Sequence, residues 1–198
     1  DVFEEIPCYS STDLKNWKYE GLVAEPDDVY NAEIMGTTKP YSIKNGKTTW
    51  LDGENVKNTA VWVGRLGVTK LSDGTYALLV QHECADYDNA LDGDTDQWSK
   101  QVLVMTSDSP NGQFTWNNRI NMKSAIGTSN TGDQTVFVDD DGTGWLVYSY
   151  GSGRGKMYLS KIKWNADHSK VVLGTPYMVY QGPGREGNCM FKYNGKYY

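Results

Sequence analysis

The chain has 198 residues, long enough for a hydrophobic core, and it contains 14 Tyr, 7 Trp and 21 Gly. Its formal net charge of −6 argues against a nucleic-acid-binding protein, because phosphate affinity comes from clustered Lys and Arg. No apolar run approaches the length of a membrane span, so we expect neither nucleic acid nor a membrane as a partner.

The sequence predicts strands and almost no helix, because amphipathic segments alternate with clusters of Gly, Asn, Asp and Ser. The first 17 residues resemble the outer part of a sheet and end in a polar turn that leads to Trp17. Similar elements lead to Trp116 and Trp164, and we expect each Trp to pack between neighbouring sheets. Strands are predicted, in chain order, at residues 61–71, 76–81, 101–106, 135–139, 144–150, 157–164 and 178–180.

Three hairpin signals separate these strands. Asp-Gly and Asn-Gly fill the φ > 0 positions of two-residue hairpin turns, and here they occur as Asp73-Gly74, Asp141-Gly142 and Asn194-Gly195. A unit that recurs every 50–70 residues or so predicts a β-propeller. The fold class is therefore all-β, with two whole propeller units and two partial ones.

A charged residue stands nine positions before each turn glycine: Arg65, Asp133 and Glu186. Equivalent positions on successive innermost strands of a propeller converge on its central channel. We therefore predict that one arginine and two carboxylates lie on adjacent inner strands and face one site.

Residues 1–198 are expected to be part of a larger propeller domain, truncated at both ends. The first unit lacks an inner strand, and the last residues stop as a second strand begins. Long insertions interrupt the units at 26–53 and 83–99, and the second, rich in Asp, is expected to cover one face.

Four motifs resemble glycoside hydrolase family 43, whose members are five-bladed propellers. The third-blade signature of that family resembles GDQTVFVDDDG at 132–142, and its fourth-blade signature resembles REGNCMFKYNGKYY at 185–198. The turns that close its first two blades are similar to YSSTDLKNW at 9–17 and TSDSPNGQF at 106–114. These motifs are most similar to the branch that includes exo-β-1,3-galactanases. Gln134 and Asn188 stand where the family usually has proline.

The resemblance implies that Glu186 is the general acid and that Asp133 orients it and keeps it protonated. An inverting glycosidase needs one carboxylic acid to protonate the leaving oxygen and one carboxylate to deprotonate water. The usual base would precede residue 1, and a histidine that helps hold a central ion would lie in a fifth blade. The resemblance thus implies no cofactor beyond a calcium ion in the intact domain, and we expect the chain by itself to be inactive.

Four further residues are candidates for substrate contact. Arg65 could bind sugar hydroxyls or a catalytic carboxylate, or form a structural ion pair. Trp62 and Trp145 are candidate sugar-stacking faces, although packing between sheets also explains them. His82 could contact substrate, or it could form a strand-end hydrogen-bonding pair with Glu83.

Several motifs predict no site. The glycine-rich segment 151–156 lacks the spacing of a phosphate-binding loop and is interpreted as a flexible loop between two strands. The acidic turn at 139–142 lacks EF-hand spacing, and the three cysteines match no zinc pattern and no disulfide framework. We therefore predict no metal ligands in this chain.

The sequence thus favours an exo-acting, inverting glycoside hydrolase that removes terminal sugars from plant or microbial polysaccharide. Side chains of galactan, arabinan or xylan are the candidate substrates. A propeller that only binds carbohydrate is the main alternative, and a retaining relative with the same fold is another. A secreted or periplasmic location is expected for an enzyme that degrades polysaccharide.

Overall fold

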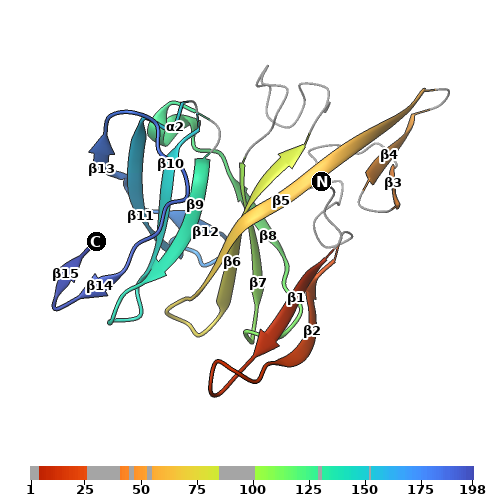
Figure 1. The fold of residues 1–198 in the computed structure, drawn as a ribbon. Helices are drawn as coiled ribbons and strands as arrows, with labels where there is room; N and C mark the ends of the chain where they lie inside the picture. The colour runs from red at the N-terminus through yellow and green to blue at the C-terminus, as the bar shows by residue number, and fades with distance from the viewer. Residues whose placement is uncertain are drawn as a thin grey trace.

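A computed structural model describes residues 5–25, 41–44, 47–52, 55–84, 101–128, 131–151 and 153–198, with side chains described at 5–25, 63–81, 101–128, 131–151 and 153–198. Strands dominate these residues (Figure 1). The only helix among them is α2 (Lys123–Ile126). No helix in the described ranges has the length and apolar character needed to cross a membrane.

The N-terminal half forms a hairpin and a six-stranded antiparallel sheet. The hairpin pairs β1 (Ile6–Ser10) with β2 (Lys18–Ala24). We call blade two the four consecutive strands β5 (Asn55–Lys70), β6 (Tyr76–Cys84), β7 (Gln101–Ser107) and β8 (Thr115–Ile120). The same sheet continues beyond β5 through β4 (Lys47–Asp52) to β3 (Tyr41–Lys44).

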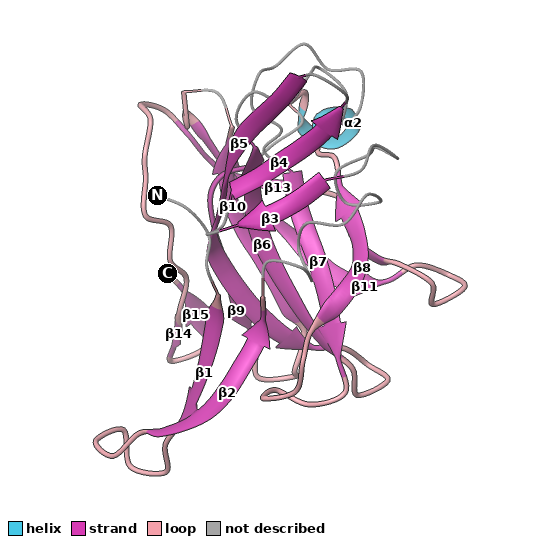
Figure 2. Ribbon diagram, turned by 90° about the vertical axis from the view of Figure 1, so that its right-hand side faces the viewer, coloured by secondary structure: helices cyan, strands magenta, loops and turns pink. Residues whose placement is uncertain are grey.

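Blade three comprises the strands β9 (Thr131–Val138), β10 (Gly144–Tyr150), β11 (Lys156–Trp164), β12 (Val171–Leu173) and β13 (Tyr177–Gln181). The outer edge of β11 pairs with β12 over one half and with β13 over the other. A last hairpin joins β14 (Lys192–Tyr193) to β15 (Lys196–Tyr197). The inner strands β5 and β9 lie side by side, so the two blades meet along the axis that the turn spacing predicted (Figure 2).

The predicted strands are all present. The bounds of β10 agree with the prediction, whereas β9 begins at Thr131 instead of residue 135. The polar residues Asp133 and Gln134 lie outside the predicted strand, but both are buried and Gln134 pairs with Tyr148 of β10. The two polar residues at the start of β9 therefore belong to the sheet.

Blade two is buried on both faces, because successive side chains of a strand point to opposite sides. One face packs on the β1–β2 hairpin through Ile6, Val23, Leu78, Val80, Leu103 and Met105. The other packs on blade three through Ala77, Leu79, Val102, Val104, Leu146 and Tyr148. Burying each large side chain contributes about 1.5–3 kcal/mol, so the two faces together hold three sheets in place.

The predicted role of the tryptophans is confirmed for two of the three. Trp116 packs against the hydrophobic cluster between blade two and the β1–β2 hairpin, and Trp164 packs against the hydrophobic cluster between blades two and three. Trp17 is 57% exposed, so the prediction is wrong there. Its indole N–H donates to the carbonyl of Leu14 in its own turn, 3.3 Å away, which keeps the ring on the hairpin.

Only one of the three turns has the predicted two-residue form. Asn194 (φ 48°) and Gly195 (φ 71°) are both left-handed, as a type I′ hairpin requires. In the other two turns only Gly74 (φ 97°) and Gly142 (φ 82°) are left-handed, and the preceding aspartates are not. These are longer hairpin connections in which glycine alone takes the left-handed position.

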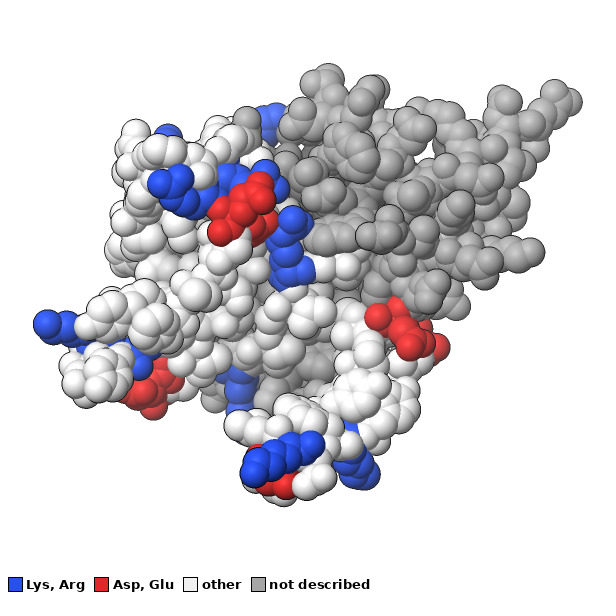
Figure 3. Space-filling model, in the orientation of Figure 1, with Lys and Arg blue, Asp and Glu red and all other residues white. Residues whose placement is uncertain are grey.

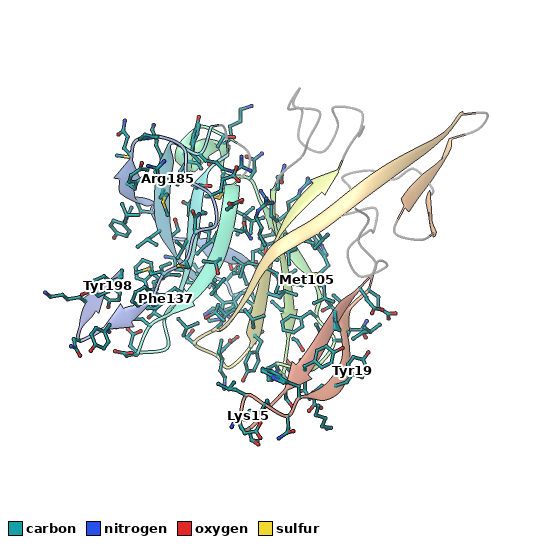
Figure 4. The ribbon with its side chains drawn as sticks, viewed as in Figure 1. Lys15, Tyr19, Met105, Phe137, Arg185 and Tyr198 are labelled. Carbon is teal, nitrogen blue, oxygen red and sulfur yellow. The ribbon has the colours of Figure 1, made fainter. Side chains whose placement is uncertain are left out.

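The β14–β15 hairpin is tied to blade three through the turn after β9. The carboxylate of Asp139 accepts hydrogen bonds from Lys192 Nζ at 2.8 Å and from the Tyr197 hydroxyl at 2.6 Å. Lys192, followed by Tyr197, lowers the pKa of Asp139 to about 2. This tie therefore stabilises the fold above the ordinary carboxyl pKa and is lost as the pH falls through about 2. The Phe137 and Tyr197 rings meet edge to face nearby, and Figure 4 labels Phe137 beside the C-terminal hairpin.

The two blades approach so closely that one of the two facing residues has to be glycine. A Cβ on Gly67 of β5 would lie 2.6 Å from the Cβ and 2.9 Å from the backbone nitrogen of Val136 in β9. A Cβ on Gly144 would lie 2.3 Å from Thr69 Oγ1. Glycine at these positions therefore sets the spacing between the blades.

Gly67→Ala should destabilise the protein by about 1–3 kcal/mol, the usual cost of overpacking, because backbone as well as side chain must move. Urea unfolding of the two proteins measures this difference. Gly174→Ala is the matched control: its new Cβ would meet Lys161 Cβ at an ordinary 3.5 Å, so its stability should change by no more than about 0.5 kcal/mol. Equal stability of Gly67→Ala and the parent chain would contradict the close approach of the blades.

Candidate active site

Asp133 lies near the start of β9 and is 7% exposed. Its backbone N–H donates to Ser149 Oγ of β10 at 2.9 Å, which fixes the position of the residue in the blade. Its carboxylate Oδ2 accepts the backbone N–H of Gly187 at 2.5 Å. A buried carboxylate needs such partners, because an uncompensated charge away from water is costly.

Arg65 of β5 forms an ion pair with Asp133, as the shared offset from the turn glycines predicted. Its Nε lies 2.6 Å from Asp133 Oδ1, and its Nη1 donates to Gln81 Oε1 at 2.6 Å. The Gln81 amide in turn donates to the carbonyls of Thr131 and Gly132 at 2.6 and 2.7 Å. One arginine and one glutamine of blade two therefore hold the start of β9.

The backbone of Arg65 is left-handed, with φ 49°. It lies in a β-bulge, where the pairing of β5 with β6 shifts register between Gly64 and Gly67. A bulge re-aims the side chains that it contains, and a left-handed non-glycine residue costs of order 1 kcal/mol or more. The cost is tolerated here because the guanidinium reaches Asp133.

Arg154 is the site residue that sequence reasoning missed. It lies in the loop between β10 and β11, also with a left-handed φ of 50°. Its Nη1 lies 3.1 Å from Glu186 Oε1, and its Nε lies 3.8 Å from Asp133 Oδ1. The sequence predicts only a flexible loop here. Because β10 runs antiparallel to β9, the loop after it returns to the level of Asp133, and this topology could have identified the arginine.

Glu186 is not on an inner strand, so that part of the prediction is wrong. It lies in the irregular segment between β13 and β14, and its side chain is 70% exposed. Gly187 is left-handed with φ 68°, which turns the chain, and its N–H binds Asp133 instead of a neighbouring strand. The three predicted charges still gather at one place, because Arg154 connects Glu186 to Asp133.

The two positions that differ from the family pattern both support this arrangement. The side-chain amide of Asn188 donates to the Asp133 carbonyl at 2.9 Å, a bond that proline cannot make. Gln134 is 5% exposed, and its Oε1 accepts the hydroxyl of Thr131 at 2.8 Å. Both residues therefore hold the segment around Asp133.

The other candidate residues do not form part of the described site. Trp145 of β10 pairs with Phe137 of β9, and the centroid of its ring lies 6.4 Å from that of Tyr177. It is thus near the end of blade three that carries the turn between β9 and β10. It stands four residues from Ser149, about 13 Å along the strand, so it lies apart from the group around Asp133, and its sugar-stacking role stays a prediction. The offset of nine residues between Asp133 and Gly142 explains the separation, since it puts Asp133 at one end of β9 and the turn, with Trp145 just after it, at the other. The side chains of Trp62 and His82 lie outside the described residues.

The site has two guanidinium groups and two carboxylates. On the face shown in Figure 3, Lys and Arg atoms flank Asp and Glu atoms at the upper end of blade three. Within the described part of the chain, no three His, Cys, Asp or Glu side chains are placed to hold a metal ion. No chemical step is therefore assigned to the calcium ion that the resemblance allows. The arrangement leaves one exposed carboxyl group beside one buried, ion-paired carboxylate.

A model of the family described as glycosyl hydrolases family 43 matches residues 43–198. No curated protein sequence matches the chain. Among solved structures, an exo-β-1,3-galactanase from Clostridium thermocellum superposes with a TM-score of 0.66 at 20% identity, over 99% of this chain and 36% of that one. A GH43 β-1,3-galactosidase with galactodeoxynojirimycin gives 0.63 at 20% identity, over 99% and 59%.

A third similar structure is an exo-β-1,3-galactanase from Phanerochaete chrysosporium with galactose, with a TM-score of 0.60 at 21% identity over 99% of this chain and 36% of that one. At these identities the likeness shows the fold, and it confirms the predicted β-propeller. The chain spans only 36% to 59% of the length of these three proteins.

The ion pair between Arg65 and Asp133 should contribute a measurable coupling free energy. In a double-mutant cycle with Arg65→Met and Asp133→Asn, we expect about 0.5–3 kcal/mol, toward the lower end because Arg65 is one-third exposed. Urea unfolding of the four proteins gives the value. The surface pair Lys18–Glu20, 3.0 Å apart and with Lys18 76% exposed, is the control and should show no measurable coupling. Equal coupling in both cycles would show that burial of Asp133 has no special effect.

Proposed function

The chain belongs to glycosyl hydrolase family 43, and from this premise we propose that it supplies the acid side of an active site that hydrolyses O-glycosyl bonds. The observation that carries the proposal is the pairing of two carboxyl groups of opposite character. Glu186 is exposed to solvent, whereas Asp133 is buried and engaged, and Arg154 connects them. Both lie inside the matched range 43–198 and within one propeller domain, of which we take residues 1–198 to be a part.

In this proposal Glu186 is the general acid. Its 70% exposed carboxyl group can reach a bound sugar, and it donates its proton to the glycosidic oxygen as the bond from that oxygen to C1 breaks. Water adds to C1 from the opposite face, which inverts the anomeric configuration. We assign the base that takes the proton from water to a residue outside the described ones.

Asp133 is suited to orient the acid and unsuited to act as the base. Arg65 faces one carboxylate oxygen and the Gly187 N–H faces the other, so neither is open to a water molecule in line with the sugar. The hydrogen bond to Gly187 also holds the residue next to Glu186 in the chain. We therefore propose that Asp133 positions Glu186 through the backbone and through its negative charge.

We propose terminal β-1,3-linked galactose as the substrate and an exo mode of attack. The support is the naming of the three similar structures as β-1,3-galactanases or a β-1,3-galactosidase, one of them with galactose bound. Arabinan and xylan side chains are less favoured by these comparisons. A polymeric substrate also favours a location outside the cytoplasm, in the medium or the periplasm.

Glu186→Ala, made in the complete domain, should nearly abolish cleavage of β-1,3-galactotriose but largely spare a dinitrophenyl galactoside, whose leaving group needs no proton. General acid catalysis contributes about 10²–10⁴-fold, and the loss on the natural substrate should fall in that range. The values of kcat/KM on the two substrates test this. Equal losses on both would remove the acid assignment. A parent domain that binds galactotriose in calorimetry but releases no galactose would instead be a carbohydrate-binding propeller.

Asp133→Asn should move the alkaline limb of the kcat/KM profile to lower pH. Removing a negative charge beside Glu186 favours loss of its proton, so the acid form disappears earlier as the pH rises. Asp167→Asn, an identical change at an exposed turn of blade three, is the control and should leave the limb in place. An unmoved limb in Asp133→Asn would contradict the electrostatic role of this residue.

A further inference from the structure

The loop that carries Arg154 is joined to the segment that carries Glu186. The backbone carbonyl of Arg154 accepts the N–H of Arg185 at 3.0 Å, and the carbonyl of Gly155 accepts the N–H of Gly182 at 2.9 Å. A Cβ on Gly184 would lie 2.5 Å from the carbonyl oxygen of Gly153, so the two segments approach at van der Waals limits. The loop and the segment between β13 and β14 are therefore joined into one unit.

The side chain of Arg154 spans both carboxyl groups from this unit. It contacts Glu186 through Nη1 at 3.1 Å and faces Asp133 through Nε at 3.8 Å, and it is 29% exposed. The left-handed backbone of Arg154 is unfavourable for a residue with a side chain, so arginine at this position has a cost in conformational energy. The guanidinium at the end of this side chain lies against the two acidic groups.

We propose that Arg154 is a positioning residue that receives the carboxylate of Glu186 as the acid gives up its proton. The inference rests on the proposed role of Glu186. In the step, the O–H bond of Glu186 breaks, its proton bonds to the leaving oxygen, and the electron pair of the C1–O bond stays on that oxygen. The negative charge that develops on Glu186 then faces the guanidinium, so Arg154 stabilises the transition state more than the ground state.

The charges around Glu186 favour this change. With Glu186 protonated, the group of Arg65, Arg154, Asp133 and Glu186 has a net charge of +1, and it becomes neutral when the proton leaves. Arg185, the neighbour of Glu186 in the chain, points elsewhere: its Nη1 donates to Gly184 and its guanidinium lies 6.0 Å from the Tyr180 ring. Figure 4 labels Arg185 at the upper end of blade three. Arg154 is thus the cation in direct contact with the acid among the described residues.

The test is Arg154→Met in the complete domain, with kcat/KM measured across pH on galactotriose and on the dinitrophenyl galactoside. Removing the cation makes Glu186 a weaker acid, so the alkaline limb should move to higher pH, opposite to the shift expected for Asp133→Asn. Cleavage of galactotriose should fall roughly 10²-fold, within the range of general acid catalysis, and the dinitrophenyl substrate should be largely spared. Arg154→Lys keeps the charge and should restore the limb toward its parent position.

Arg185→Met removes the same charge one residue from Glu186 and should move neither the limb nor the ratio between the substrates. Equal losses on both substrates with an unmoved limb would assign Arg154 a purely structural role, and parent-like behaviour would assign it none; either result overturns the inference. The far-ultraviolet spectrum and urea midpoint of each variant show whether it is folded. Failure of the proposed function is distinguishable, because then the parent domain itself would release no galactose from galactotriose, or Glu186→Ala would lose equally on both substrates.

Discussion

The buried carboxylate of Asp133 is the interaction on which the site depends. Arg65 from blade two, Arg154 from blade three and the Gly187 N–H from the segment between β13 and β14 all face this one group. No pair of these segments is close in sequence, so only the assembled sheets bring them together. The negative charge is thus the common partner of three segments, which together offset the cost of burying it.

Packing between the blades makes this anchor possible. Because both faces of blade two are covered, β5 is held at a fixed distance from β9, and Gly67 brings the two backbones into contact beside Val136. Gln81 then spans the same junction with two hydrogen bonds to β9 and accepts a third from Arg65 of its own blade. The geometry of the acidic site is in this sense an outcome of how closely two sheets approach.

The strands and the convergence of charges were predictable from the sequence, because hairpin glycines recur along it. Residues at the same distance before each glycine lie at the same height on neighbouring strands. Arg65 and Asp133 follow that rule because both lie on inner strands, Arg65 within a β-bulge. Glu186 departs from it, since Gly187 turns the chain and local hydrogen bonds replace strand pairing. Arg154 was not predictable by counting, because its place depends on the antiparallel return of β10 and on contacts with a segment about 30 residues away.

The left-handed backbone at Arg154 lowers the stability of the fold at a position whose side chain contacts both acidic groups. An L-residue in this region costs roughly 1–2 kcal/mol relative to glycine, and the ion pairs of a partly exposed guanidinium offset only part of it. A directed-evolution campaign that selects for heat resistance would therefore enrich glycine or asparagine at position 154. Such variants would be more stable but would lack the guanidinium that contacts Glu186 and Asp133. Selection for heat resistance alone would not detect this loss.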